Sequence, residues 1–156
     1  MLVQEWVHGI EYKKRILAFL YEIDDIMVPA LRGRVDIPSY AEKISQKAET
    51  IFISENGEDI ASCSVYCNTE NGFITSVAVK SKYIRRHIGT DLIENVKQYA
   101  YKLGCRKILL EVHDQNDAAI CFYKKVGFTI TGYEGEWIEM ECLLDFDGMR
   151  GKNIYE

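Results

Sequence analysis

Glu111, Asn116 and Tyr123, all within residues 104–128, are the side chains of this sequence best suited to chemistry. A carboxylate can accept a proton, a phenol can donate one, and a carboxamide can bond a polar ligand. Glu111 lies among apolar strand residues, and we expect burial there to tune it toward use as a general base. These three side chains are therefore the first candidates for a reactive site.

A strand, a polar turn and a helix must hold these side chains in place. The apolar run within residues 107–112 predicts a buried strand, which ends at the polar break that begins with His113. Over residues 116–126, apolar side chains recur at steps of three, four and seven, which predicts a helix. Asn116 is a good N-cap for this helix, and Gly127 can adopt the left-handed conformation that ends it.

The same stretch resembles the second acetyl-coenzyme A motif of the GNAT N-acetyltransferase superfamily. From Leu110 to Phe128 it matches as LEV followed by N-x-x-A-I-x-F-Y-x-K-x-G-F. The resemblance is strong over residues 50–144 and weaker in the N-terminal third. There, D-x-x-x-P-x-L-x-x-R from Asp25, followed by YAEKI, is similar to members associated with bacterial surface-sugar assembly.

The resemblance implies an α/β (α+β) fold with one domain over residues 1–156. We expect a central mixed, mostly antiparallel sheet of about six or seven strands, flanked by about four helices. It also implies acetyl transfer from acetyl-CoA (coenzyme A) to a primary amine of a small molecule, by direct attack in a ternary complex and without a metal. An amino sugar is one candidate acceptor. A protein-directed N-acetyltransferase and a non-catalytic acyl-CoA-binding domain are the alternatives.

Roles for the three side chains follow from the resemblance. Tyr123 is expected to protonate the departing thiolate, and Asn116 to bond the pantetheine or phosphate end of the cofactor. Their alternatives are a core aromatic and a helix cap. Glu111 is the candidate base, with a water chain as the alternative. Weaker candidates for the base on neighbouring strands are Ser76, Tyr66 and Glu139.

A second strand–loop–helix junction, between residues 72–79 and Gly89, is the expected phosphate site. Free amides and the helix dipole favour an anion at a helix N-terminus. By resemblance, the amides of residues 85–90 hold the pyrophosphate, and the backbone of residues 77–79 pairs with the pantetheine arm like an added strand. The expected cofactor-binding set is Val77, Ala78, Val79, Arg85, Arg86, His87, Ile88, Gly89, Thr90, Asn116 and Tyr123.

This junction departs from the family pattern at two positions. Ile84 stands where Gln or Arg is usual, and His87 stands where a glycine is usual, while Gly89 matches. Because backbone amides supply most of the contacts to the pyrophosphate, the absence of a Gln or Arg side chain at position 84 need not abolish cofactor binding. His87 is harmless if its φ is negative; it could contact phosphate or be a solvated loop residue. Arg85 and Arg86 could instead form a charged surface turn.

Composition narrows the classes of function. The 47% of hydrophobic residues suffices for a core, and the apolar runs are too short to span a membrane. A net charge of −5 argues against a nucleic-acid partner. The five cysteines form no C-x-x-C pair and the three histidines lack zinc-ligand spacing, so no metal is expected. We expect a cytoplasmic monomer or homodimer whose partner is a small amine, with neither membrane nor nucleic acid.

The rest of the chain supplies the other expected elements. Hydrophobic periodicity, turn signals and capping residues define them. Ser39 is the expected cap of the second helix, and the N-terminal helices with the last hairpin are expected to shape the acceptor pocket through Tyr12, Asp24, Asp25, Arg32, Arg34, Tyr133 and Trp137. We predict helices over 10–24, 40–47 and 89–103, a loop over 25–37, strands over 50–54, 60–66, 72–79, 129–134 and 137–144, and a polar tail over 145–156.

Overall fold

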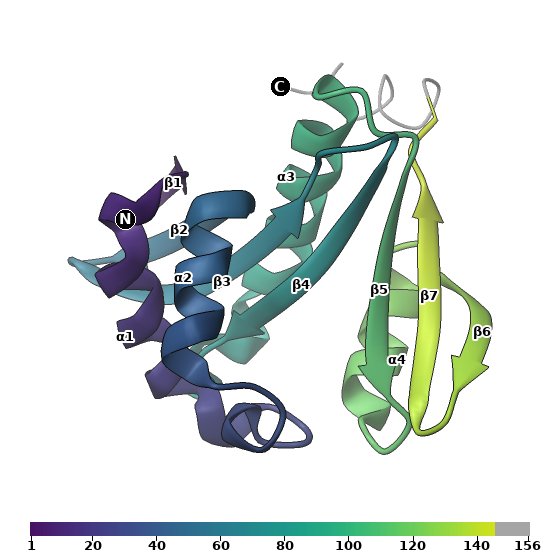
Figure 1. The fold of residues 1–156 in the computed structure, drawn as a ribbon, viewed down its shortest axis with the longest axis horizontal. Coiled ribbons are helices and arrows are strands. Elements are labelled where there is room, and N and C mark those ends of the chain that lie inside the picture. The colour runs from purple at the N-terminus through teal and green to yellow at the C-terminus, as the bar shows by residue number, and fades with distance from the viewer. Residues whose placement is uncertain (146–156) are drawn as a thin grey trace.

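One seven-stranded sheet, in the order β1-β2-β3-β4-β5-β7-β6, forms the centre of the molecule (Figure 1). The computed structural model describes residues 1–145, with Arg85 described by its backbone alone, so nearly all of the predicted polar tail lies outside the described residues. Among the strands of residues 1–145, only β4 and β5 pair in parallel. The strands are β1 (Leu2–Val7), β2 (Glu49–Glu55), β3 (Glu58–Tyr66), β4 (Asn71–Val79), β5 (Lys107–His113), β6 (Thr129–Glu134) and β7 (Trp137–Leu143).

Four α-helices flank the sheet, and the predicted fold class is confirmed. The helices α1 and α2 cover one face of β1 to β4, while α3 and α4 lie against the other face (Figure 1). No helix within residues 1–145 is long and apolar enough to cross a bilayer. The helices are α1 (Lys13–Ile23), α2 (Ile37–Lys47), α3 (Ile88–Lys102) and α4 (Asp117–Lys125), with 3-10 turns at Ile10–Tyr12, Asp24–Ile26, Leu31–Gly33 and Ser81–Arg86.

In the N-terminal region the sequence analysis missed one strand, and its expected cap for the second helix is wrong. Residues 2–7 form β1, an edge strand that was not predicted. Most of its side chains are exposed, so it lacks the apolar alternation by which a half-buried strand is recognised. Helix α2 begins at Ile37, and its cap is Asp36 rather than Ser39. The Asp36 carboxylate accepts hydrogen bonds from the Ser39 amide (3.1 Å) and hydroxyl (2.6 Å), and Pro38 sits in the first turn, where it needs no donor.

Two apolar clusters, one on each face, hold the layers together. The cluster between α1, α2 and the sheet includes Phe19 and Phe52, whose rings pack edge to face at 5.9 Å. The larger cluster joins α3 and α4 to all of the inner strands and includes Leu92 and Phe128, which are almost fully buried. Each such side chain stabilises the fold by about 1.5–3 kcal/mol through burial.

A split in the sheet between β4 and β5 positions the functional site. The two strands pair only from Asn71 to Phe73 with Lys107 to Leu109. Beyond that point they diverge (Figure 1), and β4 bulges at Thr75, which is skipped in its register with β3. The Tyr40 hydroxyl of α2 donates to the Thr75 carbonyl at 2.7 Å and so fixes the bulge. The outcome is a cleft between two strand ends.

Candidate functional site

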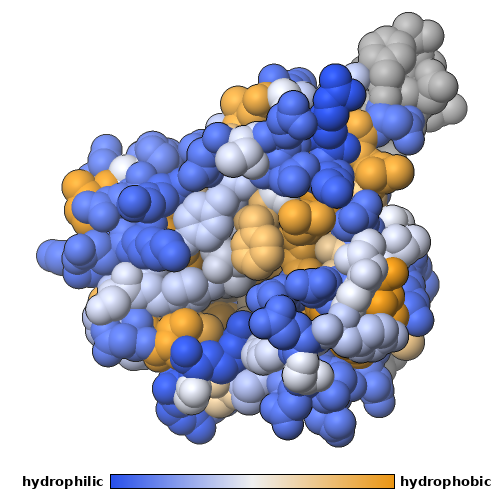
Figure 2. Space-filling model, turned by 45° about the vertical axis from the view of Figure 1, so that its right-hand side comes forward, coloured by the Kyte–Doolittle hydropathy of each residue, from blue (hydrophilic) through white to orange (hydrophobic). Residues whose placement is uncertain are grey.

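The cleft between the diverging strands brings together residues from both halves of the sheet. Figure 2 looks toward this side of the molecule and shows apolar side chains in the middle of the face, bordered by hydrophilic ones. Residues from β4, β5, α4, the segment before α2 and the start of β7 line it. They are Ile26, Met27, Val28, Arg34, Ile74, Thr75, Ser76, Val77, Ala78, Leu110, Glu111, Val112, His113, Asn116, Ala119, Tyr123 and Trp137.

The β4 wall of the cleft offers backbone groups. Strand β3 pairs with one edge of β4 as far as Val79, but β5 leaves the other edge after Phe73. The edge formed by residues 77–79 therefore has no strand partner on the cleft side. An extended ligand with amide groups could pair there as an added strand, which suits the pantetheine arm that the sequence predicted.

The N-terminus of α3 lies at the end of this wall, and no side chain that the structure describes caps it. His87, the N-cap residue, has φ 59° and ψ 16°, so the condition of a negative φ, under which a non-glycine residue would be harmless here, is not met. His87 therefore adopts the left-handed conformation that a glycine would adopt more easily, and this lowers the stability of the fold by about 1–2 kcal/mol. The amides of Ile88, Gly89 and Thr90 open the helix and lack intrahelical acceptors, as an anion site requires.

Two basic side chains near this terminus, those of Arg86 and Lys80, pair with carboxylates. The Arg86 guanidinium donates to both carboxylate oxygens of Glu55, at 3.1 and 2.8 Å, and this bidentate pairing holds the pKa of Glu55 below its usual range. Lys80 pairs with Glu22 at 2.9 Å and Glu58 at 3.4 Å. The Arg85 side chain lies outside what the structure describes. The backbone amides can therefore bind an anion without a contribution from Arg86 or Lys80.

Gly89 serves the packing of α3 against α4. A β-carbon at this position would lie 3.3 Å from the ring of Phe122 and 3.7 Å from Val79. Its backbone φ is outside the left-handed range, so the glycine here serves close approach of the two helices and not a special backbone conformation. The contact ties the uncapped helix N-terminus to the helix that carries Tyr123.

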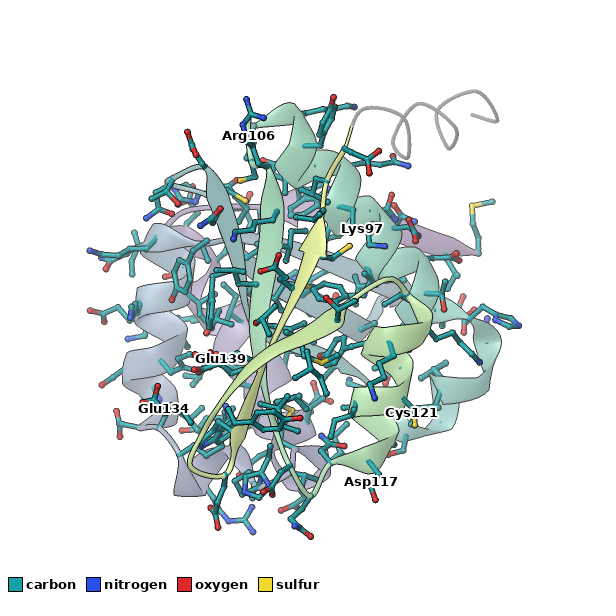
Figure 3. All side chains as sticks on the ribbon, turned by 90° about the vertical axis from the view of Figure 1, so that its right-hand side faces the viewer. Lys97, Arg106, Asp117, Cys121, Glu134 and Glu139 are labelled. Atoms are coloured by element: carbon teal, nitrogen blue, oxygen red, sulfur yellow. The ribbon has the colours of Figure 1, made fainter. Side chains whose placement is uncertain are left out.

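Asn116 is the predicted N-cap of α4, and this prediction is confirmed. Its side-chain oxygen accepts a hydrogen bond from the Ala119 amide at 3.2 Å. At the other end of α4, the buried ammonium of Lys97 (Figure 3) donates to the Val126 carbonyl, a favourable place for a cation at a helix C-terminus. Asn116 also lines the cleft, so its carboxamide can serve both as cap and as ligand donor.

Tyr123 projects from α4 toward the sheet. It is only 8% exposed, and its ring packs edge to face against Phe122 and Phe128. Burial, with the nearby Cys63 thiol, raises the pKa of its phenol, so the hydroxyl is protonated at neutral pH. Because this hydroxyl forms no hydrogen bond with a described residue and lines the cleft, it is free to donate one to a ligand.

Glu111 lines the same cleft from β5, but its predicted burial is wrong. Its neighbours Leu110 and Val112 face the core, so alternation along the strand turns Glu111 to the opposite face, where it is exposed. The argument from burial for Glu111 as base therefore fails. Of the weaker candidates, Ser76 lines the cleft with Glu111, whereas Tyr66 and Glu139 lie outside its lining.

Two predicted acceptor residues contact each other across the mouth of the cleft, and this contact was not predicted. The guanidinium of Arg34, just before α2, lies 4.6 Å above the ring of Trp137 at the start of β7. His113, which the sequence pattern marks only as the end of a strand, packs edge to face on the same ring at 5.3 Å. Of the other predicted acceptor residues, Asp24 and Asp25 instead bond Arg32, at 3.0 and 2.5 Å.

Cysteine and metal chemistry find little support in the described residues. All five cysteines are free, and residues 1–145 contain no cluster of three or more potential metal ligands. Burial raises the pKa of the Cys63 thiol, which leaves it a poor nucleophile.

Comparison with known proteins identifies relatives over most of the fold. A family model described as "Acetyltransferase (GNAT) family" matches residues 17–128. The chain is 40% identical over 79 residues to the Drosophila melanogaster "Probable N-acetyltransferase san", covering 46% of this chain and 43% of that protein. It is 27% identical over 99 residues to human N-alpha-acetyltransferase 30, covering 59% of this chain and 27% of that protein. The matched regions thus span less than half of these curated relatives.

Among solved structures, the PaiA N-acetyltransferase of Thermoplasma acidophilum, crystallised in complex with coenzyme A, has the same fold. Its TM-score is 0.74 at 17% sequence identity, over 92% of this chain and 99% of that one. At this identity, the likeness concerns the fold alone.

Proposed function

This chain belongs to the acetyltransferase (GNAT) family, and on that premise we propose that it transfers an acetyl group from acetyl-CoA to the primary amine of a small molecule. The observation that carries the proposal is the cleft between β4 and β5. The β4 edge at residues 77 and 78 and the protonated phenol of Tyr123 line this cleft, and the N-terminus of α3, where no described side chain caps the helix, follows the end of β4. These are the donors that a thioester with a pyrophosphate tail requires.

Acetyl-CoA would be held chiefly by backbone groups. The amides of residues 85–90 would bind its pyrophosphate, and the β4 edge at residues 77–79 would pair with its pantetheine arm. The coenzyme A complex of the PaiA structural neighbour supports this choice of ligand. Asn116 would contribute its carboxamide from the α4 side of the cleft.

The reaction needs no covalent enzyme intermediate. The neutral amine attacks the thioester carbonyl, forming a C–N bond as the C–S bond breaks. A β4 amide can donate to the carbonyl oxygen as charge develops there. Tyr123 would give its proton to the departing thiolate and recover one from solvent. The amine proton would pass to Glu111 or to water; an exposed Glu111 can exchange it with solvent directly.

The contact between Arg34 and Trp137 favours a small acceptor. It joins the segment before α2 to the β6–β7 hairpin across the cleft, so that the mouth is bridged rather than open along its length. An amino sugar fits such a site as one candidate, because Trp137 offers an aromatic face. Protein N-termini are the second candidate, supported by the likeness to N-alpha-acetyltransferase 30.

Two measurements test this function. Calorimetry should show acetyl-CoA binding at micromolar to millimolar levels, and no binding at millimolar levels would refute the proposal. Release of free coenzyme A would then be followed with simple amines, amino sugars and peptides that carry a free N-terminus. Turnover of peptides alone would establish the protein-directed alternative, and binding without any turnover would establish the non-catalytic one.

A further inference from the structure

Strand β4 reverses its two faces at the bulge. In a regular strand, side chains two and four positions apart point to the same face of the sheet. Ile74, just before the bulge, belongs to the apolar cluster that joins α3 and α4 to the sheet, whereas Ala78 belongs to the cluster under α1 and α2. The register with β3 skips Thr75, which lies between these two positions. This one extra residue therefore decides which side chains of β4 face which pair of helices.

The same reversal decides which backbone groups of β4 point into the cleft. The Lys80 amide, directly after β4, donates to the Ile60 carbonyl of β3 at 2.9 Å. Hydrogen-bonded and non-hydrogen-bonded positions alternate along an antiparallel pair, so Ala78 bonds β3, while the backbone groups of Val77 and Val79 point to the other edge. Strand β5 has diverged from that edge (Figure 1). The amide of Val77, which lines the cleft, is therefore directed toward a ligand there.

A side chain of α2 bonds the bulged residue. The extra residue of a bulge is left out of the ladder, and a shielded carbonyl without a donor lowers stability. The Tyr40 hydroxyl donates to the Thr75 carbonyl at 2.7 Å and also lies 2.7 Å from the Thr75 hydroxyl. Since the one phenolic proton goes to the carbonyl, the Thr75 hydroxyl can donate to the phenolic oxygen. Tyr40 thus bonds two polar groups of the residue that forms the bulge.

Tyr40 acts on the cleft only from behind. It does not line the cleft, whereas Thr75 does. Its ring packs against the apolar cluster under α1 and α2, and burial raises the pKa of its phenol, so the hydroxyl stays a donor at neutral pH. Tyr40 and Thr75 are 35 positions apart in the chain, and their contact joins α2 to the strand edge that would bind the thioester. Any influence of Tyr40 on a ligand therefore passes through the bulge.

We propose that Tyr40 is a positioning residue for acetyl transfer: by holding Thr75, it keeps the Val77 amide aimed at the carbonyl oxygen of the thioester. The inference rests on the proposed acetyl transfer. Negative charge develops on that oxygen as the amine attacks, and a donor that is fixed beforehand stabilises it best. Without the Tyr40 hydroxyl the bulge persists, because Ile74 and Ala78 still pack on opposite faces, but its carbonyl is unpaired and the amide is less firmly held.

The first test removes the hydroxyl and keeps the ring. In Tyr40→Phe, kcat with saturating acetyl-CoA should fall about tenfold, less than the cost of deleting an oxyanion donor outright. Affinity for coenzyme A, measured by calorimetry, should stay within about twofold, because the amides expected to hold its pyrophosphate lie beyond β4 and coenzyme A carries no acetyl group. Tyr21→Phe, which removes a phenol hydroxyl from a 55% exposed side chain on α1, is the control and should change neither value.

A double-mutant cycle tests whether Tyr40 acts through Thr75. Thr75→Val removes the hydroxyl and should lower kcat in the wild-type background, and Thr75→Ser, which keeps it, should lower kcat less. In the Tyr40→Phe background, Thr75→Val should add little, because the bond it removes is already lost. Effects that multiply independently would overturn the inference. Circular dichroism would show that each variant is folded.

Nuclear magnetic resonance tests the amide directly and needs no turnover. Replacing coenzyme A by acetyl-CoA should shift the Val77 amide signal of the wild type, because only acetyl-CoA brings a thioester carbonyl, and the shift should be smaller in Tyr40→Phe. If no amine is acetylated, this smaller shift would still support the role of Tyr40, while the proposed transfer would fail. Equal shifts in both proteins, an unchanged kcat where chemistry limits the rate, or a tenfold loss of coenzyme A affinity would each overturn the inference.

Discussion

The two strand–loop–helix units that border the cleft are alike in topology and differ in what they offer a ligand. The β4–α3 unit presents backbone: a strand edge without a partner and a helix N-terminus without a side-chain cap. The β5–α4 unit presents side chains: Asn116 caps the helix, Tyr123 points into the cleft, and Glu111 lines it. A backbone site tolerates changes of residue type as long as the conformation survives, whereas a side-chain site does not.

This difference explains why the family pattern is intact in one unit and altered in the other. Ile84 and His87 depart from the usual residues, yet His87 still holds the left-handed conformation that begins α3. Four predictions test this difference between the β4–α3 unit and the β5–α4 unit, from the largest expected effect to the smallest.

Replacing Tyr123 by Phe should lower kcat by about 10²–10⁴-fold, the usual contribution of general acid–base catalysis. Because burial raises the pKa of this phenol above its ordinary value of about 10, the deficit should be the same at pH 7 and pH 9. Stopped-assay kinetics with saturating acetyl-CoA would measure it. Tyr101→Phe, on α3 and away from the cleft, is the control. An unchanged kcat, where chemistry limits the rate, would remove Tyr123 from the mechanism.

Replacing Gly89 by Val should destabilise the fold by about 1–3 kcal/mol, the range for overpacking. The new side chain would meet the Phe122 ring and separate the two units, so affinity for coenzyme A should fall too. Urea denaturation and calorimetry would measure the two effects. Gly33→Val, where a β-carbon meets nothing within 4 Å, should change stability by less than about 0.5 kcal/mol. Equal effects at both glycines would contradict the packing role of Gly89.

Replacing Glu111 by Gln should lower kcat/KM by about tenfold at neutral pH, equivalent to about 1.4 kcal/mol. The deficit should shrink at high pH, where more of the acceptor amine is already neutral and a base matters less. A pH profile of kcat/KM for wild type, Glu111→Gln and the exposed control Glu134→Gln would measure it. A profile identical to the wild type would assign the proton to water.

Replacing His87 by Gly should have the smallest effect. Relief of the left-handed conformation should raise stability by at most about 1 kcal/mol, since glycine also gains entropy in the unfolded chain. Affinity for coenzyme A should stay within about twofold if the amides alone hold the pyrophosphate. A tenfold loss of affinity would instead show that the imidazole itself contacts phosphate.

Sequence reasoning found elements with a strong period and missed those without one. The strand and helix from 107 to 125 and the cap at Asn116 agree with prediction, because apolar spacing and a capping residue act locally. Strand β1 escaped prediction because an exposed edge strand carries little alternation. Helix α2 begins at Ile37, three residues before the predicted start. Asp36 caps it instead of Ser39, and Asp36 lies in the segment that was predicted to be a loop.

Residue type alone singled out part of the candidate site. Tyr123 and Asn116 line the cleft, and their roles toward the cofactor stay predictions. The exposure of Glu111, the contact of Arg34 with Trp137 and the bulge at Thr75 were not predictable, because each depends on which face of a strand meets which neighbour. Arg34 and Trp137, for example, are more than a hundred positions apart in the sequence.

From α1 onward, the order of the main helices and strands can be deduced from the sequence alone, and so can the family, because short-range periodicity, caps and motif spacing involve residues close together in the chain. The point where β4 leaves β5, and the backbone groups of residues 1–145 that this leaves without a strand partner, become visible only in the folded chain. Those outcomes depend on register and on contacts between distant segments, and neither is encoded in local spacing.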